Sequence, residues 1–270
     1  MKFACIDIET IPNQSLPEGA TPEFDPDDVK VGNVKDPIKI QEKIDKAEMD
    51  FNKGLAKKMS TDKDLCQVIT FVGYIYTTSL TEDPKDKIID KKVLQWPPLD
   101  EEYEVIYEAW NFIKHAYNDK IPLVSFGGNG FDLPVLFAAA IRLDVPLSRS
   151  MYDAITFRYE NNHHYDLMRS LTGEIHPVRG KSLEFYLNCF QLGNKATDMD
   201  GSQVYPAWQA KEYTKIAEYC EQDVLMTAKL FERIEPWLAK GIDEAGEEIE
   251  RDEGQELSDD ELWDDDKPTK

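Results

Sequence analysis

The sequence predicts an α/β protein in which helices pack against a sheet. Apolar runs of strand length come first, and segments of helical periodicity then alternate with short apolar runs. At its C-terminal end the chain becomes acidic and poor in apolar residues, a composition that cannot bury enough surface to fold alone. We therefore expect one folded domain over residues 1–240 and a disordered acidic tail over residues 241–270.

The first half of the chain alternates between continuous apolar runs, which predict buried strands, and apolar stripes at three- and four-residue steps, which predict helices. A loop rich in proline and acidic residues, from Thr10 to about Val34, separates the first strand from the first helix. In order, we expect a strand at 3–9, a helix at 36–59, strands at 66–77 and 87–94, and a helix at 101–117 with Asp100 as its N-cap.

The second half begins with a short apolar run that leads into three glycines within four residues. Glycines there allow a sharp turn and the close approach of a substrate. We expect a strand at 122–126, a helix ending near residue 143, short helices at 165–171 and 182–190, and a long helix at 210–239. The inward stripe of the long helix consists of Ile216, Cys220, Val224, Thr227 and Phe231.

Charge and cysteine usage exclude several classes of protein. The formal net charge is −22, and residues 243–270 hold fourteen acidic against three basic residues, so half of the imbalance lies in the tail. The remaining chain is still acidic and is not a basic clamp that holds nucleic acid by charge alone. No apolar run approaches the about 18 residues of a membrane span. Four scattered cysteines without a CxxC pair indicate reduced thiols in a cytosol, with no zinc site and no disulfide framework.

Asp7 and Glu9 are two residues apart in an apolar strand, so alternation places both carboxylates on one face. Two such acids repel each other and are costly to bury, and a divalent cation between them removes both penalties. An edge strand with a solvated polar face is the alternative explanation. The apolar neighbours of the pair favour the metal site.

Asp132 and the pair Tyr219 and Asp223 are the other candidates. Asp132 follows the glycines and begins a helix, where it could also serve as an ordinary N-cap. Tyr219 and Asp223 are one turn apart on the long helix and share a face. An aspartate on such an inward stripe is unusual unless it meets a cation or a donor, whereas the tyrosine alone could be ordinary core.

The order of these motifs along the chain resembles the DEDD superfamily of 3′–5′ exonucleases, in the subtype with tyrosine. DIETIP, NGFDLPVL and YCEQDVLMT look like its three motifs, and the sister subtype would carry histidine where Glu218 stands. HYDLM at 164–168, SLEFYLNCF at 182–190 and GNK at 193–195 are similar to predicted exonucleases related to the proofreading domain of family-B DNA polymerases. The resemblance covers about residues 1–238, apart from a loop and helix at about 12–64.

The resemblance implies a ribonuclease-H-like mixed sheet flanked by helices and two divalent cations, Mg²⁺ or Mn²⁺. It implies that Asp7, Glu9 and Asp223 hold one ion, that Asp7 also binds the second, and that Asp132 contributes through water. Carboxylate oxygens suit these ions. Tyr219 would orient the attacking water, since its ordinary pKa near 10 makes it a poor base.

The expected activity is removal of nucleotides from a 3′ end of DNA, single-stranded by preference. The expected location is the cytoplasm, for a protein encoded by a bacterium or by a phage. Thr10 and Asn129 are expected to contact the terminal nucleotide, and Phe131 either stacks on a base or packs in the core. RNA ends remain an alternative substrate. So does a non-catalytic module whose acidic tail recruits a replication partner or mimics DNA charge; no membrane is expected as a partner.

Three weaker candidates complete the sequence. His163 and His164 are adjacent on an expected loop and are interpreted as surface residues rather than metal ligands. Asp166 is expected to cap the short helix after it, with a fifth acid of the site as the alternative. The lysines of the 36–59 helix either follow a phosphate backbone or, with the interleaved acids, form a solvated face.

Overall fold

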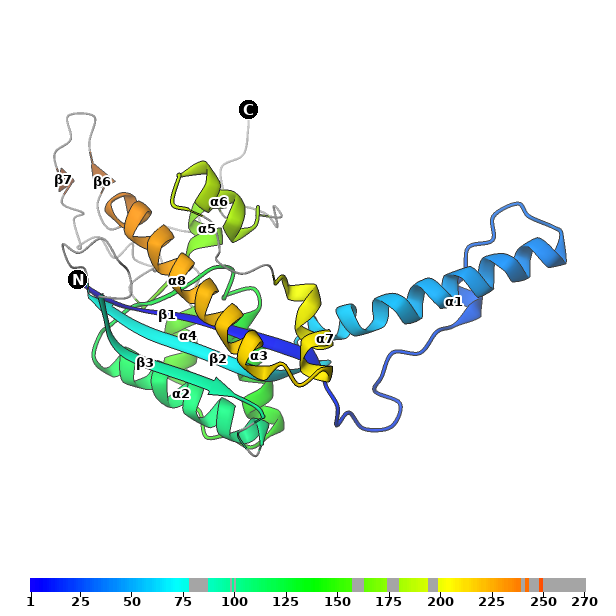
Figure 1. Ribbon diagram of the computed structural model, residues 1–270, viewed down its shortest axis with the longest axis horizontal. Helices are drawn as coiled ribbons and strands as arrows, with labels where there is room; N and C mark the ends of the chain where they lie inside the picture. The colour runs from blue at the N-terminus through cyan, green and yellow to red at the C-terminus, as the bar shows by residue number, and fades with distance from the viewer. Residues whose placement is uncertain are drawn as a thin grey trace, which may run out of the picture. The chain divides into compact units, whose positions relative to one another are not determined.

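The computed structural model describes residues 1–77, 87–97, 99, 101–156, 163–173, 180–193, 199–238, 241–242 and 248–249 (Figure 1). Contacts between residues divide the chain into two compact units, 1–232 and 233–270. The first unit contains the central sheet and all of the predicted site residues.

The central sheet has five strands in the order β3-β2-β1-β4-β5. The strands are β1 (Lys2–Pro12), β2 (Cys66–Thr77), β3 (Ile88–Gln95), β4 (Leu123–Ser125) and β5 (His164–Asp166). β2 is antiparallel to β1 and to β3, whereas β4 is parallel to β1 and to β5. This mixed sheet, with helices on both faces, confirms the predicted α/β class and the ribonuclease-H-like arrangement.

Alternation along β1 separates two apolar clusters. Ala4, Ile6 and Ile8 belong to the larger cluster, with residues of α2 (Glu102–Asn118), α3 (Asp132–Arg142) and α4 (Arg149–Thr156). The other face of β1 meets α8 (Tyr213–Leu238): Phe3 contacts Phe231, and α7 (Val204–Gln209) packs nearby. Asp7 and Glu9 are therefore on the face of the sheet that α8 covers (Figure 1).

The predicted first strand is shorter than the real one. β1 continues to Pro12, and Thr10, expected to begin a loop, is buried within the strand. Between Glu9 and Thr10 the register against β2 shifts, because Glu9 pairs with Thr70 and Thr10 with Val68. Such bulges re-aim side chains beside functional sites, and this one separates the last acid of β1 from Thr10.

The long predicted helices are confirmed. α1 (Pro37–Ser60) has Asp36 as its N-cap, and the Asp36 side chain accepts a hydrogen bond from the Ile38 amide at 3.0 Å. The inward stripe predicted for α8 is buried, and α2 also buries one apolar face. α2 has Glu101 as its N-cap, without a side-chain cap bond, while the predicted cap Asp100 lies outside the described residues. Of the two short helices, α5 spans Leu167–Thr172 and α6 spans Leu183–Cys189.

Three short elements were missed by the sequence patterns: α4, β5 and α7. α8 also begins at Tyr213 rather than at residue 210, because α7 ends just before it. Two 3₁₀ turns, η1 (Pro26–Asp28) and η3 (Gly201–Gln203), precede α1 and α7. Each of these elements has only a few residues, so periodicity carries little signal for it.

An ion pair between buried Glu102 and partly exposed Arg142 joins the start of α2 to the end of α3. The two carboxylate oxygens of Glu102 accept from the Arg142 guanidinium at 2.7 and 2.9 Å, and one also accepts from the Val68 amide at 3.0 Å. The Glu102 side chain is 4% exposed and that of Arg142 is 34% exposed. This contact fixes both helices to β2.

Unit 233–270 contains the end of α8 and two short antiparallel strands, β6 (Gly241–Ile242) and β7 (Glu248–Ile249). These strands fall within the segment predicted to be disordered; the other residues of 241–270 lie outside the described residues. Within the described ranges, none of the helices has both the length and the apolar character to cross a membrane. All four cysteines are free thiols, and three of them are buried.

Candidate active site at the carboxyl end of the central strand

The two acids of β1 lie on one face, as predicted, and meet α8. A carboxylate oxygen of Asp7, one of Glu9 and the Sγ atom of Cys220 all lie within 4.8 Å of one another. The Cys220 thiol donates to Asp7 Oδ2 at 3.4 Å. The sequence identified Cys220 as an inward residue of the long helix but not as a neighbour of the acids. Its position one residue after Tyr219 is the only signal for that contact.

Asp132 is the first residue of α3 and is 6% exposed. It is not the N-cap of its helix: that position is Phe131, and the helix has no side-chain cap bond. Capping of the helix, the usual reason for an aspartate at a helix start, therefore does not explain Asp132. Burial, followed by the nearby carboxylates of Asp166 and Asp223, raises the pKa of Asp132 to about 8.

Tyr219 and Asp223 occupy the same face of α8, one turn apart, and a hydrogen bond joins the hydroxyl to the carboxylate. Burial, then the charges of Asp223, Glu9 and Asp7, raise the pKa of Tyr219 well above its ordinary value. The hydroxyl therefore stays protonated at neutral pH. It can donate and accept hydrogen bonds, but it is not a base.

The charges of all three other acids affect the pKa of Asp7. Its pKa is raised by burial and then by the charges of Asp132, Asp223 and Glu9, although the bond from Cys220 opposes this. Four carboxylates from β1, α3 and α8 thus converge, and each charge disfavours the next. A set of buried and half-buried oxygen donors with unbalanced negative charge fits a hard divalent cation such as Mg²⁺ or Mn²⁺.

The loop between β4 and α3 brings Asp132 to the site. Gly127 has φ of 86°, which favours glycine, and Gly128 leaves no room for a Cβ beside the Ser125 side chain. The Asp166 carboxylate accepts from the amides of Gly127 and Asn129 at 2.9 and 3.0 Å.

Asp166 also accepts from the Arg169 amide at 3.3 Å as the N-cap of α5, which confirms the predicted cap. The same carboxylate therefore caps a helix and holds the glycine turn, a second function that the sequence did not reveal. Its charge still reaches Asp132, whose pKa it helps to raise.

The prediction that both histidines lie at the surface is wrong for His164. His164 is in β5, is 3% exposed and has a pKa lowered by burial to about 4, so its ring is neutral. Its Nδ1 lies 3.1 Å from the Ile155 carbonyl and 3.2 Å from Asn129 Oδ1, while its Nε2 lies 2.8 Å from Ser125 Oγ. These partners satisfy the ring inside the protein, which a polar sequence pattern could not show.

The three residues predicted to contact substrate have different surroundings. Thr10 donates its hydroxyl proton to the Ser60 carbonyl at 2.6 Å, and therefore ties β1 to the end of α1. Asn129 has its Oδ1 beside His164. Phe131 packs partly against the larger core cluster and partly lines a cavity. Their contacts with a nucleotide remain a prediction.

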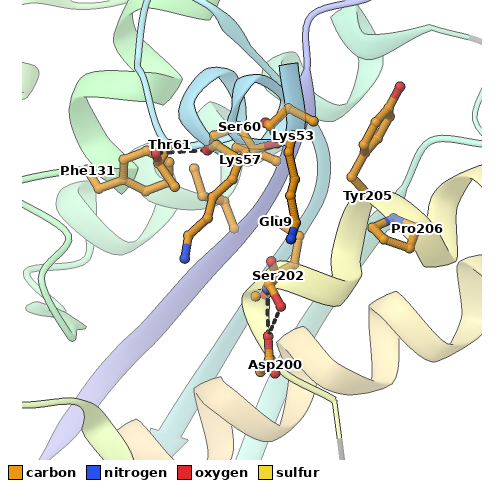
Figure 2. Close-up of a pocket in the computed structure, with 14 residues that line it drawn as sticks. Glu9, Lys53, Lys57, Ser60, Thr61, Phe131, Asp200, Ser202, Tyr205 and Pro206 are labelled. Atoms are coloured by element: carbon orange, nitrogen blue, oxygen red, sulfur yellow. Dashed lines mark hydrogen bonds between the residues drawn. The ribbon is translucent and has the colours of Figure 1, made fainter. Parts of the chain in front are cut away.

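A cavity of about 710 Å³ adjoins Glu9, which is the one acid of the four that lines it (Figure 2). β1 forms one wall, with Glu9 and Thr10. α1 forms a second wall, and the segment from η3 to α7 forms a third. The lining residues are Ile8, Glu9, Thr10, Lys53, Ala56, Lys57, Ser60, Thr61, Phe131, Asp200, Gly201, Ser202, Tyr205 and Pro206. The volume is within the range of about 300–1,000 Å³ that ligand pockets have.

Residues 74–257 match a family model described as a predicted 3′–5′ exonuclease related to the exonuclease domain of PolB. The matched range contains Asp132, Tyr219 and Asp223, whereas β1 and α1 precede it. A comparison with curated proteins finds no match.

The fold is similar to the structure of the family B DNA polymerase from the hyperthermophilic archaeon Pyrobaculum calidifontis, with a TM-score of 0.53 and 19% identity. The similarity covers 88% of this chain and 25% of the polymerase, so the chain spans about a quarter of that protein's length.

Proposed function

Because the chain belongs to the family of predicted 3′–5′ exonucleases related to the exonuclease domain of PolB, we propose that it removes nucleotides from the 3′ end of single-stranded DNA. Relation to the exonuclease domain of a DNA polymerase supports DNA as the substrate. The observation that carries the proposal is that carboxylate oxygens of Asp7 and Glu9 lie within 4.8 Å of each other, with Asp132 and Asp223 near enough for their charges to raise the pKa of Asp7.

The four carboxylates would hold two divalent cations, Mg²⁺ or Mn²⁺. Asp7, Glu9 and Asp223 would hold one ion, Asp7 would also help to hold the second, and Asp132 would contribute through water. When bound, such ions lower the pKa of a water and stabilise the leaving 3′ oxygen. Burial, and after it the charges of neighbouring acids, raises the pKa values of Asp7 and Asp132, which supports this assignment because cations would stabilise the charged carboxylates.

The remaining residues orient the substrate and the water. Tyr219 keeps its proton and lies beside Asp223, so its hydroxyl orients the attacking water without removing a proton from it. Thr10 and Phe131 lie on the wall of the cavity next to Glu9, where the terminal nucleotide would enter. Asn129 lies beside His164, two residues before Phe131, and would reach the nucleotide from the glycine turn.

Cleavage of a single strand labelled at its 5′ end tests the proposal. With Mg²⁺ or Mn²⁺ we expect a ladder that shortens from the 3′ end, release of mononucleotides and complete loss of both with EDTA. Parallel reactions with an RNA strand of the same sequence and with a blunt duplex measure the preference for single-stranded DNA. Equal rates on RNA would support the alternative substrate, and absence of cleavage with every ion would contradict the proposed function.

The boundaries and the tail are separate proposals. Residues 1–240 would form the exonuclease domain of a cytoplasmic protein that is encoded by a bacterium or by a phage. The acidic tail would bind a basic protein partner. Leu262 and Trp263 among the acids of the tail would act as its anchors. A protein ending at Lys240 should still cleave DNA but lose capture of that partner, and unchanged capture would contradict the assignment.

A further inference from the structure

We propose that helix α1 is an arm that guides the single strand into the site, with Lys53 and Lys57 binding its phosphates and Tyr205 stacking on one of its bases. This inference rests on the proposed function. It concerns a helix that precedes the residues matched by the family model, 74–257.

The position of α1 beside the acids is the first observation. Lys53 and Lys57 extend from α1 into the cavity that Glu9 also lines (Figure 2). The two lysines are one helical turn apart and therefore present two amines on one face. A strand whose 3′ end lies at Glu9 would pass between this face and α7.

The attachment of α1 is the second observation. Met59 is the buried residue of the helix, and the Ser60 carbonyl accepts the Thr10 hydroxyl bond. Both contacts lie within two turns of Lys53 and Lys57. The end of the helix that carries these lysines is therefore fixed to the strand that carries Asp7 and Glu9.

The third observation concerns charge. Lys53 and Lys57 are exposed, and neither takes part in the ion pairs that join residues of the described ranges. Asp200 is the acid of the opposite wall; its Oδ1 accepts from the Ser202 amide and hydroxyl at 2.8 and 2.6 Å. These bonds, and to a smaller extent the charge of Lys57, lower the pKa of Asp200. The amines therefore remain available to a polyanion in an otherwise acidic protein.

The fourth observation is the aromatic wall. Tyr205 lines the cavity and stacks with Trp208 at 6.2 Å between ring centroids, and Trp208 stacks with Trp96 at 5.9 Å. A ring held in such an array loses little freedom when a base stacks on it. Aromatic stacking tolerates any base, which suits a nuclease that degrades a strand residue by residue.

Binding of fluorescent oligothymidylate to the full chain, measured in EDTA across a salt series, tests the arm without cleavage. Lys53→Gln with Lys57→Gln should weaken binding about tenfold at low salt. It should also reduce the slope of log affinity against log salt by about 1.4, since each phosphate contact on a single strand contributes about 0.7. Tyr205→Leu should weaken binding about tenfold and Tyr205→Phe should not.

Lys46→Gln with Lys58→Gln is the matched control. Lys46 and Lys58 are exposed on the same helix and do not line the cavity. Their substitution removes the same two positive charges. Equal salt slopes for the two double variants, with both proteins folded by circular dichroism, would overturn the arm. Because the binding assay needs no turnover, it is independent of the cleavage assay. If the protein cleaves DNA but the two double variants have equal salt slopes, only the role of α1 is rejected. If the Lys53 and Lys57 variant has the reduced slope but the protein does not cleave DNA, only the proposed nuclease activity is rejected.

Discussion

Asp7 is the carboxylate whose removal should separate chemistry from folding. Asp7→Ala should abolish cleavage, because Asp7 would be shared by both cations. Thermal stability in EDTA should hold or rise, since burial and three neighbouring acids disfavour the charge of Asp7 and raise its pKa. Nucleotide release and thermal unfolding measure the two effects, with Asp50→Ala, on the exposed face of α1, as control. Near-normal turnover by the folded variant would contradict the assignment.

Tyr219→Phe should have a smaller and different effect. The ring still packs, and only the hydroxyl and its bond to Asp223 are lost. We expect a rate lower by about 10–10³-fold, with little change in Mg²⁺ affinity, because the hydroxyl positions water and is not a ligand. Single-turnover cleavage and Mg²⁺ titration separate the two quantities, and Tyr107→Phe on the exposed face of α2 is the control. Loss of Mg²⁺ affinity in parallel with rate would show a different role.

At the scale of single residues, the sequence predicts partners that share one element but not those that meet across elements. Strand alternation predicts that Asp7 and Glu9 share a face, and helical spacing predicts the same for Tyr219 and Asp223. The thiol of Cys220 beside Asp7 depends on how α8 crosses β1, which no local period encodes. His164 was assigned to the surface for the same reason, since its partners come from Ser125, Asn129 and Ile155.

At the scale of elements, the pair Glu102 and Arg142 should stabilise the junction of α2, α3 and β2. Arg142→Gln leaves a carboxylate that is 4% exposed without its guanidinium. Loss of one partner of a buried pair costs about 3–5 kcal/mol, and we expect about 1–3 here because Arg142 is 34% exposed and solvent screens its charge.

Urea unfolding in EDTA measures this cost, and Lys215→Gln is the control. Lys215 pairs with Glu212 at 3.2 Å, but both side chains are about half exposed, so its loss should matter little. Equal midpoints for the two variants would mean that the α2–α3 contact contributes nothing to stability.

Elements were predictable where one face is long and apolar. β2, α2 and α8 combine length with a clear period, and their bounds differ from expectation by a few residues at most. β5 consists of His-Tyr-Asp, and its polar residues are stabilised by pairing with β4 and by the bonds of His164 and Asp166. A strand of this kind is specified by its partners, so its own sequence resembles a loop.

At the scale of the whole molecule, net charge and proposed substrate oppose each other. The chain carries −22, and four of its acids gather at one site. An anionic strand would meet less repulsion from such a protein where cations neutralise the acids and where lysines line the path. The cations at the carboxylates would lower the repulsion at the site, and the two amines of α1 would lower it along the path, with or without the cations.

The same carboxylates predict how stability depends on pH when no metal is bound. The pKa of Asp132 is about 8, and that of Asp7 is also raised, whereas the unfolded carboxyls titrate near about 4. Between these values the folded protein holds protons that the unfolded chain has lost, so stability should fall as pH rises through the window. His164, with a pKa of about 4 against 6.5 unfolded, acts in the opposite direction, but only below about pH 6.5.

The decline between about pH 6.5 and 8 should therefore come from the acids. Thermal unfolding in EDTA should show a midpoint that falls across this range, and millimolar Mg²⁺ should remove the decline, because ligation stabilises the charged carboxylates. Asp132→Asn stays neutral at every pH and should give a flatter curve in EDTA. If the variant and the parent protein lost stability equally across this range, Asp132 would not hold a proton in the metal-free site, and the crowding of carboxylates that favours a cation there would be weaker than the structure indicates.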